Sequence, residues 1–178
     1  MSRFVIDPAF RSQALEQIPD ADYVDILVVP LPPGATHDPV RWVDATFGVG
    51  DAPPWVRALF ALRQSVVGLV GISRGAGDDF TIRQVLGDEA LVHVDEQHLE
   101  FAAGLGVDAE SGLVRLTTTV RLHNWRGRLY FAPVRALHRP VAGAMLRRAA
   151  RRLEPSTAAG QRVCRSRNSS RLPNGSAA

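Results

Sequence analysis

The hydrophobic pattern of the chain changes its period once between residues 80 and 153, and this change limits the fold more than any other feature. From residue 80 to residue 124, apolar and polar residues alternate, which is typical of strands with one buried face. Turn-forming residues interrupt the alternation at Gly87-Asp88 and again within residues 108–112. The pattern therefore predicts four consecutive antiparallel strands, at residues 80–86, 90–95, 97–107 and 113–124.

The two longest of these strands predict a sheet with one apolar face. Pairing them across residues 108–112 is expected to place Leu99 opposite Val120 on that face. The other face is expected to point toward water, with Glu100 diagonal to Arg121 as an ion pair. The members of this outer face are His98, Glu100, Thr117, Thr119, Arg121 and His123.

After Gly127 the spacing of apolar residues becomes helical and stays so to Leu153. Pro133 and Pro140 lie inside this pattern, and each removes a backbone hydrogen bond and clashes with the preceding turn. We therefore expect a bend or a 3₁₀ start before a straight helix from Pro140. The expected apolar stripe is Tyr130, Val134, Leu137, Val141, Met145, Ala149 and Leu153.

The N-terminal part carries one strand pattern, at residues 23–30, among three helix starts with an acid followed by proline. These starts lie at Asp7-Pro8, Asp38-Pro39 and Asp51 to Pro54, so two helices follow the first strand. Together the elements predict an α+β fold of the helix-grip type, in which a curved antiparallel sheet wraps around a long C-terminal helix. We expect a single domain over residues 1–153 and a disordered, arginine- and serine-rich tail over residues 154–178.

Charge is segregated along the chain. All 21 basic residues are arginine, and residues 111–153 contain ten arginines and no acid. Residues 1–110 carry seven arginines and 17 acids, so the folded part is close to neutral. A dedicated nucleic-acid module is usually basic throughout, so we do not expect a nucleic-acid partner. The remaining basic feature is the cluster Arg147, Arg148, Arg151 and Arg152, which is expected to be a solvated helix face.

Cysteine usage and hydropathy indicate the compartment. The single cysteine, Cys164, cannot form an intramolecular disulfide, and residues 1–8 contain no apolar run of an export signal. The most apolar stretch, residues 58–72, is shorter than the roughly 20 residues that a membrane span needs. We therefore expect a cytoplasmic protein without a membrane span.

Several short motifs, in order, resemble a bacterial family known as domain of unknown function 2867. They are Ala21-Asp22-Tyr23-Val24-Asp25, residues 97–101, residues 117–124, Gly127 to Phe131, His138-Arg139 and residues 145–149. The resemblance implies a fold similar to the START and polyketide-cyclase superfamily. The family has no established reaction, so the resemblance transfers no catalytic residue.

The leading functional hypothesis is a domain that binds an apolar small molecule between the sheet and the C-terminal helix. Aromatic residues predict either an apolar cavity there or a filled core of the same side chains. The candidate ligand-binding residues are Trp42, Trp55, Phe101, Thr118 and Tyr130.

Two alternatives remain open, an enzyme of cyclase or isomerase type and a basic interaction module built on the helix arginines. The enzyme would use Tyr130 or His138 as its acid–base group. No nucleophile or phosphate-binding motif is present, so we expect a binding domain rather than an enzyme. His98, His123 and Glu100 form a formal ligand set, but we expect no metal and no cofactor because their face should point outward.

Overall fold

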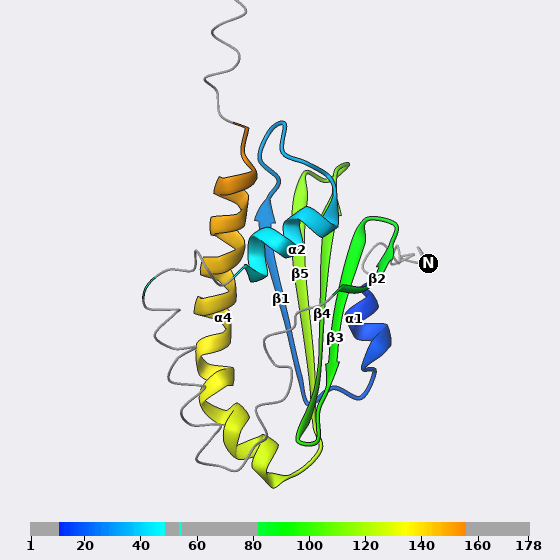
Figure 1. Ribbon diagram of the computed structural model, residues 1–178, viewed down its shortest axis with the longest axis vertical. Coiled ribbons are helices and arrows are strands. Elements are labelled where there is room, and N and C mark those ends of the chain that lie inside the picture. The colour runs from blue at the N-terminus through cyan, green and yellow to red at the C-terminus, as the bar shows by residue number, and fades with distance from the viewer. Residues whose placement is uncertain (1–10, 49–53, 55–81, 156–178) are drawn as a thin grey trace, which may run out of the picture.

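The computed structural model describes residues 11–48, 54 and 82–155. Five antiparallel strands form one curved, open sheet in the order β1-β5-β4-β3-β2, and a long C-terminal helix packs against it (Figure 1). The expected α+β architecture is confirmed. The elements are α1 (Gln13–Gln17), β1 (Tyr23–Pro30), α2 (Pro39–Phe47), β2 (Ile82–Leu86), β3 (Glu89–Asp95), β4 (Leu99–Asp108), β5 (Leu113–Leu122) and α4 (Trp125–Leu153).

Two of the expected helices lie partly or wholly outside the described residues. The start at Asp7-Pro8 is not described, and of the helix expected after Asp51 only Pro54 is. The start at Asp38-Pro39 is confirmed, because the Asp38 carboxylate accepts a hydrogen bond from the Val40 backbone N–H at 2.9 Å.

The β2–β3 hairpin turns at Gly87-Asp88 as expected, with Gly87 at φ +60°. Phe80 and Thr81, which were expected in its first strand, lie outside the described residues. The pairing of β2 with β3 shifts register between Ile82 and Gln84, which places a bulge in this edge strand.

The expected β4–β5 pairing is wrong by two residues. Leu99 lies opposite Leu122, and Phe101 lies opposite Val120. The cause is the turn: Asp108 stays in the ladder, and only residues 109–112 form the connection. Because the shift is an even number, every side chain keeps its expected face of the sheet.

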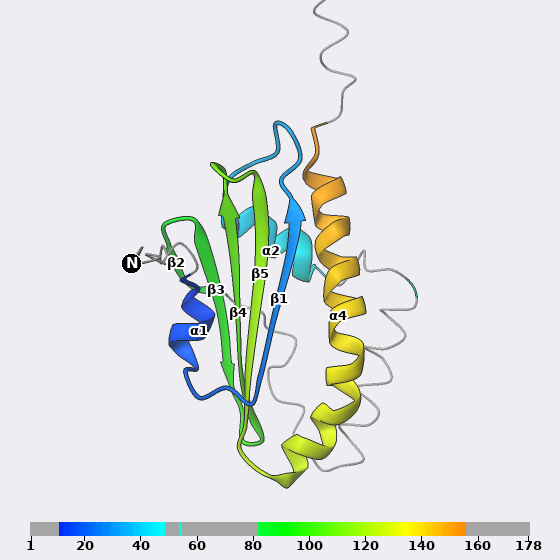
Figure 2. The same ribbon diagram turned by 180° about the vertical axis from the view of Figure 1, so that it is seen from behind.

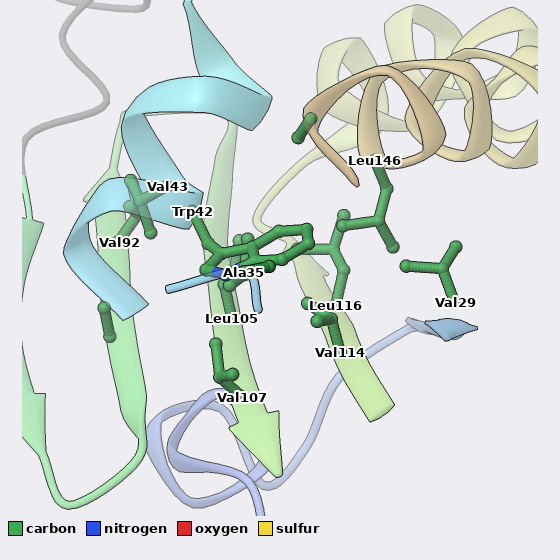
Figure 3. Close-up of a cluster of buried hydrophobic side chains, with 13 residues drawn as sticks. Val29, Ala35, Trp42, Val43, Val92, Leu105, Val107, Val114, Leu116 and Leu146 are labelled. Carbon is green, nitrogen blue, oxygen red and sulfur yellow. The ribbon is translucent and has the colours of Figure 1, made fainter. Parts of the chain in front are cut away.

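One face of the sheet packs against α2 and the C-terminal half of α4. Trp42 of α2 is fully buried between the sheet and α4, close to Leu105 and Leu146 (Figure 3). Its indole N–H donates to the Thr36 carbonyl oxygen at 2.8 Å, so the buried polar atom is satisfied. This cluster forms the main core of the domain: Val29, Ala35, Trp42, Val43, Ala90, Val92, Ala103, Leu105, Val107, Val114, Leu116, Leu146 and Ala149.

The opposite face, which was expected to point toward water, is partly covered by α1. Ala14 and Ile18 pack against Leu91 and Ala102. The Thr119 hydroxyl donates to the Ala14 carbonyl oxygen at 2.9 Å. The expectation of a solvated face is therefore wrong for four of its members, because Thr117, Thr119, His98 and Glu100 are buried.

A buried carboxylate on β3 holds α1 in place. Glu89 accepts the Ser12 hydroxyl at 2.6 Å and the Gln13 backbone N–H at 3.2 Å. A five-residue helix is marginal on its own, so these bonds and the apolar contacts position it. Gly104 on β4 leaves the space that the Glu89 carboxylate occupies.

The α4 helix is continuous from Trp125 to Leu153, with both prolines inside it and Asn124 accepting from the Gly127 N–H. No 3₁₀ segment starts it. Figures 1 and 2 show α4 running beside β1, with its first turns inclined to the rest, which agrees with the expected bend. None of the helices in the described part of the chain is long and apolar enough to cross a membrane.

The expected apolar stripe of α4 is buried or half-buried at every position except Leu137. Leu137 is 42% exposed, whereas Phe131 is buried and His138 is half-buried. Phe131 and His138 contact the ring of Tyr23 on β1. The buried residues of the helix are Gly127, Phe131, Gly143, Met145, Leu146 and Ala149.

The two glycines buried in α4 provide a matched pair of substitutions. A Cβ at Gly127 would overlap the backbone carbonyl oxygen of His98, which the adjoining strand holds. We expect Gly127→Ala to lower the free energy of unfolding by about 1–3 kcal/mol in urea denaturation. A Cβ at Gly143 would meet only the flexible end of the Arg147 side chain, so Gly143→Ala should be neutral or stabilise by up to about 1 kcal/mol. Equal effects of the two substitutions would contradict this packing.

Candidate functional site

A cluster of polar and aromatic side chains lies between β1 and the first half of α4. Its centre is Asp25, whose side chain is only 3% exposed on the face of the sheet that α4 covers. Tyr23 lies two residues earlier, on the same face of the strand. A carboxylate this buried destabilises the fold unless charged or hydrogen-bonding partners surround it.

The α4 helix supplies two of these partners from neighbouring positions. His138 Nδ1 lies 3.0 Å from Asp25 Oδ2, and an Arg139 guanidinium nitrogen lies 3.4 Å from Asp25 Oδ1. His138 Nδ1 also lies 3.3 Å from the Tyr23 hydroxyl. The two oxygens of one buried carboxylate therefore join the sheet to the helix.

The shorter contact places the proton of His138 on Nδ1, from which it is donated to Asp25. In neutral His138 the lone pair then lies on Nε2, and no described residue forms a hydrogen bond to that atom. Burial raises the pKa of the Tyr23 hydroxyl, and the negative charge of Asp25 and a hydrogen bond to it raise that pKa further. With its pKa raised from about 10, Tyr23 stays neutral at physiological pH.

Aromatic rings surround this polar group. The Tyr23 ring meets Phe131 edge-on at 5.2 Å and the His138 ring at 5.6 Å between centroids. The Arg135 guanidinium lies 5.8 Å from the centroid of the Tyr23 ring. The arrangement combines apolar ring surface with one imidazole nitrogen available as an acceptor.

Register places two of the expected ligand-binding residues beside this cluster. Thr118 lies opposite Asp25, and Phe101 shares a row across the sheet with Tyr23 through Val120. Of the expected catalytic candidates, His138 is part of the cluster. Tyr130 is half-buried, directly before Phe131 and about two turns from His138 along α4, and the tyrosine beside Asp25 is Tyr23.

Trp42 belongs to the opposite end of the same interface. It is enclosed in the packed core close to Leu105 (Figure 3), whose row of the sheet contains Leu27, four residues along β1 from Tyr23. Trp55 lies outside the described residues. The helix-facing side of the sheet therefore has an apolar, filled end and a polar–aromatic end.

Sequence reasoning missed Tyr23 and Asp25 as site residues, although a signal was available. Alternate residues of this strand face the core, so residue 25 is expected to point inward together with Leu27 and Val29. An acid at such a position requires a buried partner. The motifs containing Asp25 and His138, which are far apart in the sequence, meet in this cluster.

Comparison with known proteins gives one match. The model of the family described as "Protein of unknown function (DUF2867)" matches residues 17–145, which include Tyr23, Asp25 and His138. The chain belongs to the DUF2867 family. Neither the curated proteins nor the solved structures contain a match to it.

The DUF2867 chain carries a second polar group on the opposite face of the sheet. Glu100 pairs with His93 at 3.0 Å and with Arg121 at 2.7 Å. His123 pairs with Asp95 at 3.0 Å. Glu100 lies directly opposite Arg121 and is buried, so the expected diagonal, solvated pair is wrong.

The remaining expected candidates of the DUF2867 chain are dispersed. His37 is exposed in the segment before α2. Among the helix arginines, Arg147, Arg151 and Arg152 are exposed and Arg148 is half-buried. A hollow between α2 and the end of α4 is lined by Arg41, Asp44, Ala45, Arg152 and Leu153.

The role of Asp25 predicts a measurable change in the ionisation of Tyr23. The chain has only two tyrosines, so Tyr130→Phe leaves the Tyr23 phenolate as the only one seen by ultraviolet absorbance. In that background the pKa of Tyr23 should lie above its ordinary value of about 10. Adding Asp25→Asn should lower it, because the negative charge is removed. An unchanged pKa would show that Asp25 does not act on Tyr23.

The same shift fixes the pH range of the effect on stability. The pKa of Tyr23 is higher in the folded than in the unfolded chain. The contribution of Tyr23 to stability is therefore complete below about pH 10 and is lost as the pH rises through the pKa of the folded chain. Unfolding experiments at increasing alkaline pH should therefore show a steeper loss of stability with Tyr23 present than in Tyr23→Phe.

Proposed function

We propose that this DUF2867 domain binds an apolar small molecule at the polar–aromatic end of the interface between the sheet and α4. The observation that carries the proposal is the Asp25–His138 pair, which holds an imidazole beside aromatic rings and leaves its Nε2 atom as an acceptor. Binding sites for small molecules are mostly apolar with a few placed polar groups, and this end of the interface has that composition.

The packing of the domain supports this location over the Trp42 end. At the Trp42 end the side chains of α2, α4 and the sheet are buried against one another. At the other end Tyr23, Phe101 and His138 are only half-buried. A ligand at this end would cover ring surface that the core leaves partly open.

The proton arrangement indicates which polar group the ligand carries. With the Nδ1 proton donated to Asp25, neutral His138 accepts a hydrogen bond at Nε2. The best partner is a hydroxyl or enol donor on an otherwise apolar molecule. The helix-grip arrangement of sheet and C-terminal helix supports this proposal but does not specify the ligand.

A second candidate function is acid–base catalysis of the cyclase or isomerase type. The 3.0 Å contact between Asp25 and His138 favours it, because a carboxylate that holds Nδ1–H makes Nε2 a positioned general base. His138 would then take a proton from the bound molecule and return it elsewhere on the same molecule. Asp25 would orient the imidazole without contacting the substrate.

Native mass spectrometry of the chain purified from its own host tests the binding function. We expect the folded protein to retain a small molecule that is released on unfolding. His138→Ala should reduce its occupancy, with a loss of affinity of about tenfold for one hydrogen bond. His37→Ala is the matched control, because His37 is exposed and distant in the fold, and it should retain the molecule. A wild-type protein that carries no molecule would contradict the proposal.

The catalytic alternative is tested with the molecule recovered from the wild-type protein. Incubation in D₂O should introduce deuterium at a carbon that loses and regains a proton, and His138→Gln should abolish this uptake. Asp25→Asn should slow it while binding persists, because the imidazole loses its orientation. Binding without deuterium uptake would rule out this chemistry and leave the binding function intact.

A further inference from the structure

The cluster of charged side chains and histidines on the other face of the sheet contains potential metal ligands that the proposed function does not use. It comprises His93 and Asp95 on β3, Glu100 on β4, Arg121 on β5, and His123 directly after β5. Asp95, Glu100 and Arg121 lie opposite one another across three neighbouring strands. The α1 helix covers the part of this face around Leu91 and Ala102 and does not pack against the exposed Asp95.

Three of these side chains bring metal-ligand atoms together. The ligand atoms of Asp95, Glu100 and His123 all lie within 4.8 Å of one another, and His123 Nε2 is 3.0 Å from Asp95 Oδ1. In a tetrahedral zinc site with ligands at about 2.0–2.2 Å from the ion, ligand atoms lie roughly 3.4 Å apart. Small side-chain rotations would bring the set to that spacing.

We propose that Asp95, Glu100 and His123 form a binding site for a divalent transition-metal ion of the Zn²⁺ type. One imidazole and two carboxylates supply three ligands, which leaves a fourth position for water or an exogenous group. The two carboxylates lie near two cations, Arg121 on Glu100 and Arg83, whose Nε donates to the His93 carbonyl oxygen at 3.3 Å. The ligand geometry rather than net charge therefore carries the proposal.

The partners of Glu100 position it as a ligand. His93 Nε2 contacts Oε1 at 3.0 Å, and Arg121 contacts Oε2 at 2.7 Å, so the carboxylate is held from both sides. Groups of this kind orient the ligands of metal sites without contacting the ion. His93 and Arg121 are therefore positioning residues in this site.

The backbone beneath the site is rigid. The ladder pairs Asp95 with Glu100 and Glu100 with Arg121, and the His123 N–H donates to the His98 carbonyl oxygen at 2.9 Å. By contrast, the contact between His123 and Asp95 involves an Asp95 side chain that is 60% exposed, where an isolated ion pair contributes little stability. Two ligands on adjacent strands and a third directly after β5 are thus held together by the sheet and not by their mutual attraction.

Cobalt is a suitable probe because a four-coordinate Co²⁺ ion has visible absorption bands. The experiment uses the full chain without a histidine tag and with Cys164→Ser, since the thiol is itself a metal ligand. We expect one equivalent of Co²⁺ to bind and to be displaced by Zn²⁺. Asp95→Asn and His123→Ala should each weaken binding about 100-fold or more. His93→Gln should weaken it about 10- to 100-fold through the orientation of Glu100.

Two control variants distinguish binding at these three ligands from metal binding elsewhere on the chain and from unfolding. His37→Ala removes an exposed histidine elsewhere and should leave the affinity unchanged. Asp95→Asn keeps the shape of an exposed side chain, so its unfolding temperature without metal should equal that of the parent. No Co²⁺ binding by the parent, or equal binding by the parent and His123→Ala, would overturn the proposal. The site lies on the opposite face of the sheet from His138, so its outcome does not depend on the small-molecule site.

Discussion

The placement of Asp25 on the inward side of β1 constrains the rest of the helix-facing surface. Its side chain is 3% exposed, and a bare carboxylate there would oppose folding strongly. His138, Arg139 and Tyr23 compensate it, and two of the three come from α4. These contacts fix which side of the α4 residues around His138 faces β1. The polar contact and the apolar packing of Leu146 and Ala149 together hold the long helix on the sheet.

The same contact divides the interface into regions with different properties. Toward Trp42, the side chains are apolar and buried on all sides, which is the arrangement that gives most of the stability. Toward Tyr23, polar atoms and half-buried rings replace close apolar packing. The fold thus separates the apolar packing that stabilises the domain from the polar side chains that could bind a ligand. The opposite face of the sheet carries a further set of potential metal ligands.

Local signals in the sequence predicted the helices and strands well, but predicted strand pairing and side-chain burial less well. The alternation of residues 97–124 identified the strands and the correct face of each side chain, but not the pairing, because a turn of four residues can close at more than one position. Burial of Thr119 and Glu100 could not be predicted, since it depends on α1 and on neighbouring strands that are distant in the sequence. His138 was a candidate because of its position near Pro140, whereas its contact with Asp25 depends on which face of the helix meets β1.

The bulge in β2 has a consequence for how copies of the domain behave toward one another. Among the described strands β2 is an edge of the sheet, and its Val85 and Leu86 side chains are exposed, so a regular strand there would be a template for another chain. The register shift between Ile82 and Gln84 interrupts the row of donors and acceptors that such a chain would need. An irregular edge of this kind disfavours the pairing of β2 with a strand of another copy of the domain.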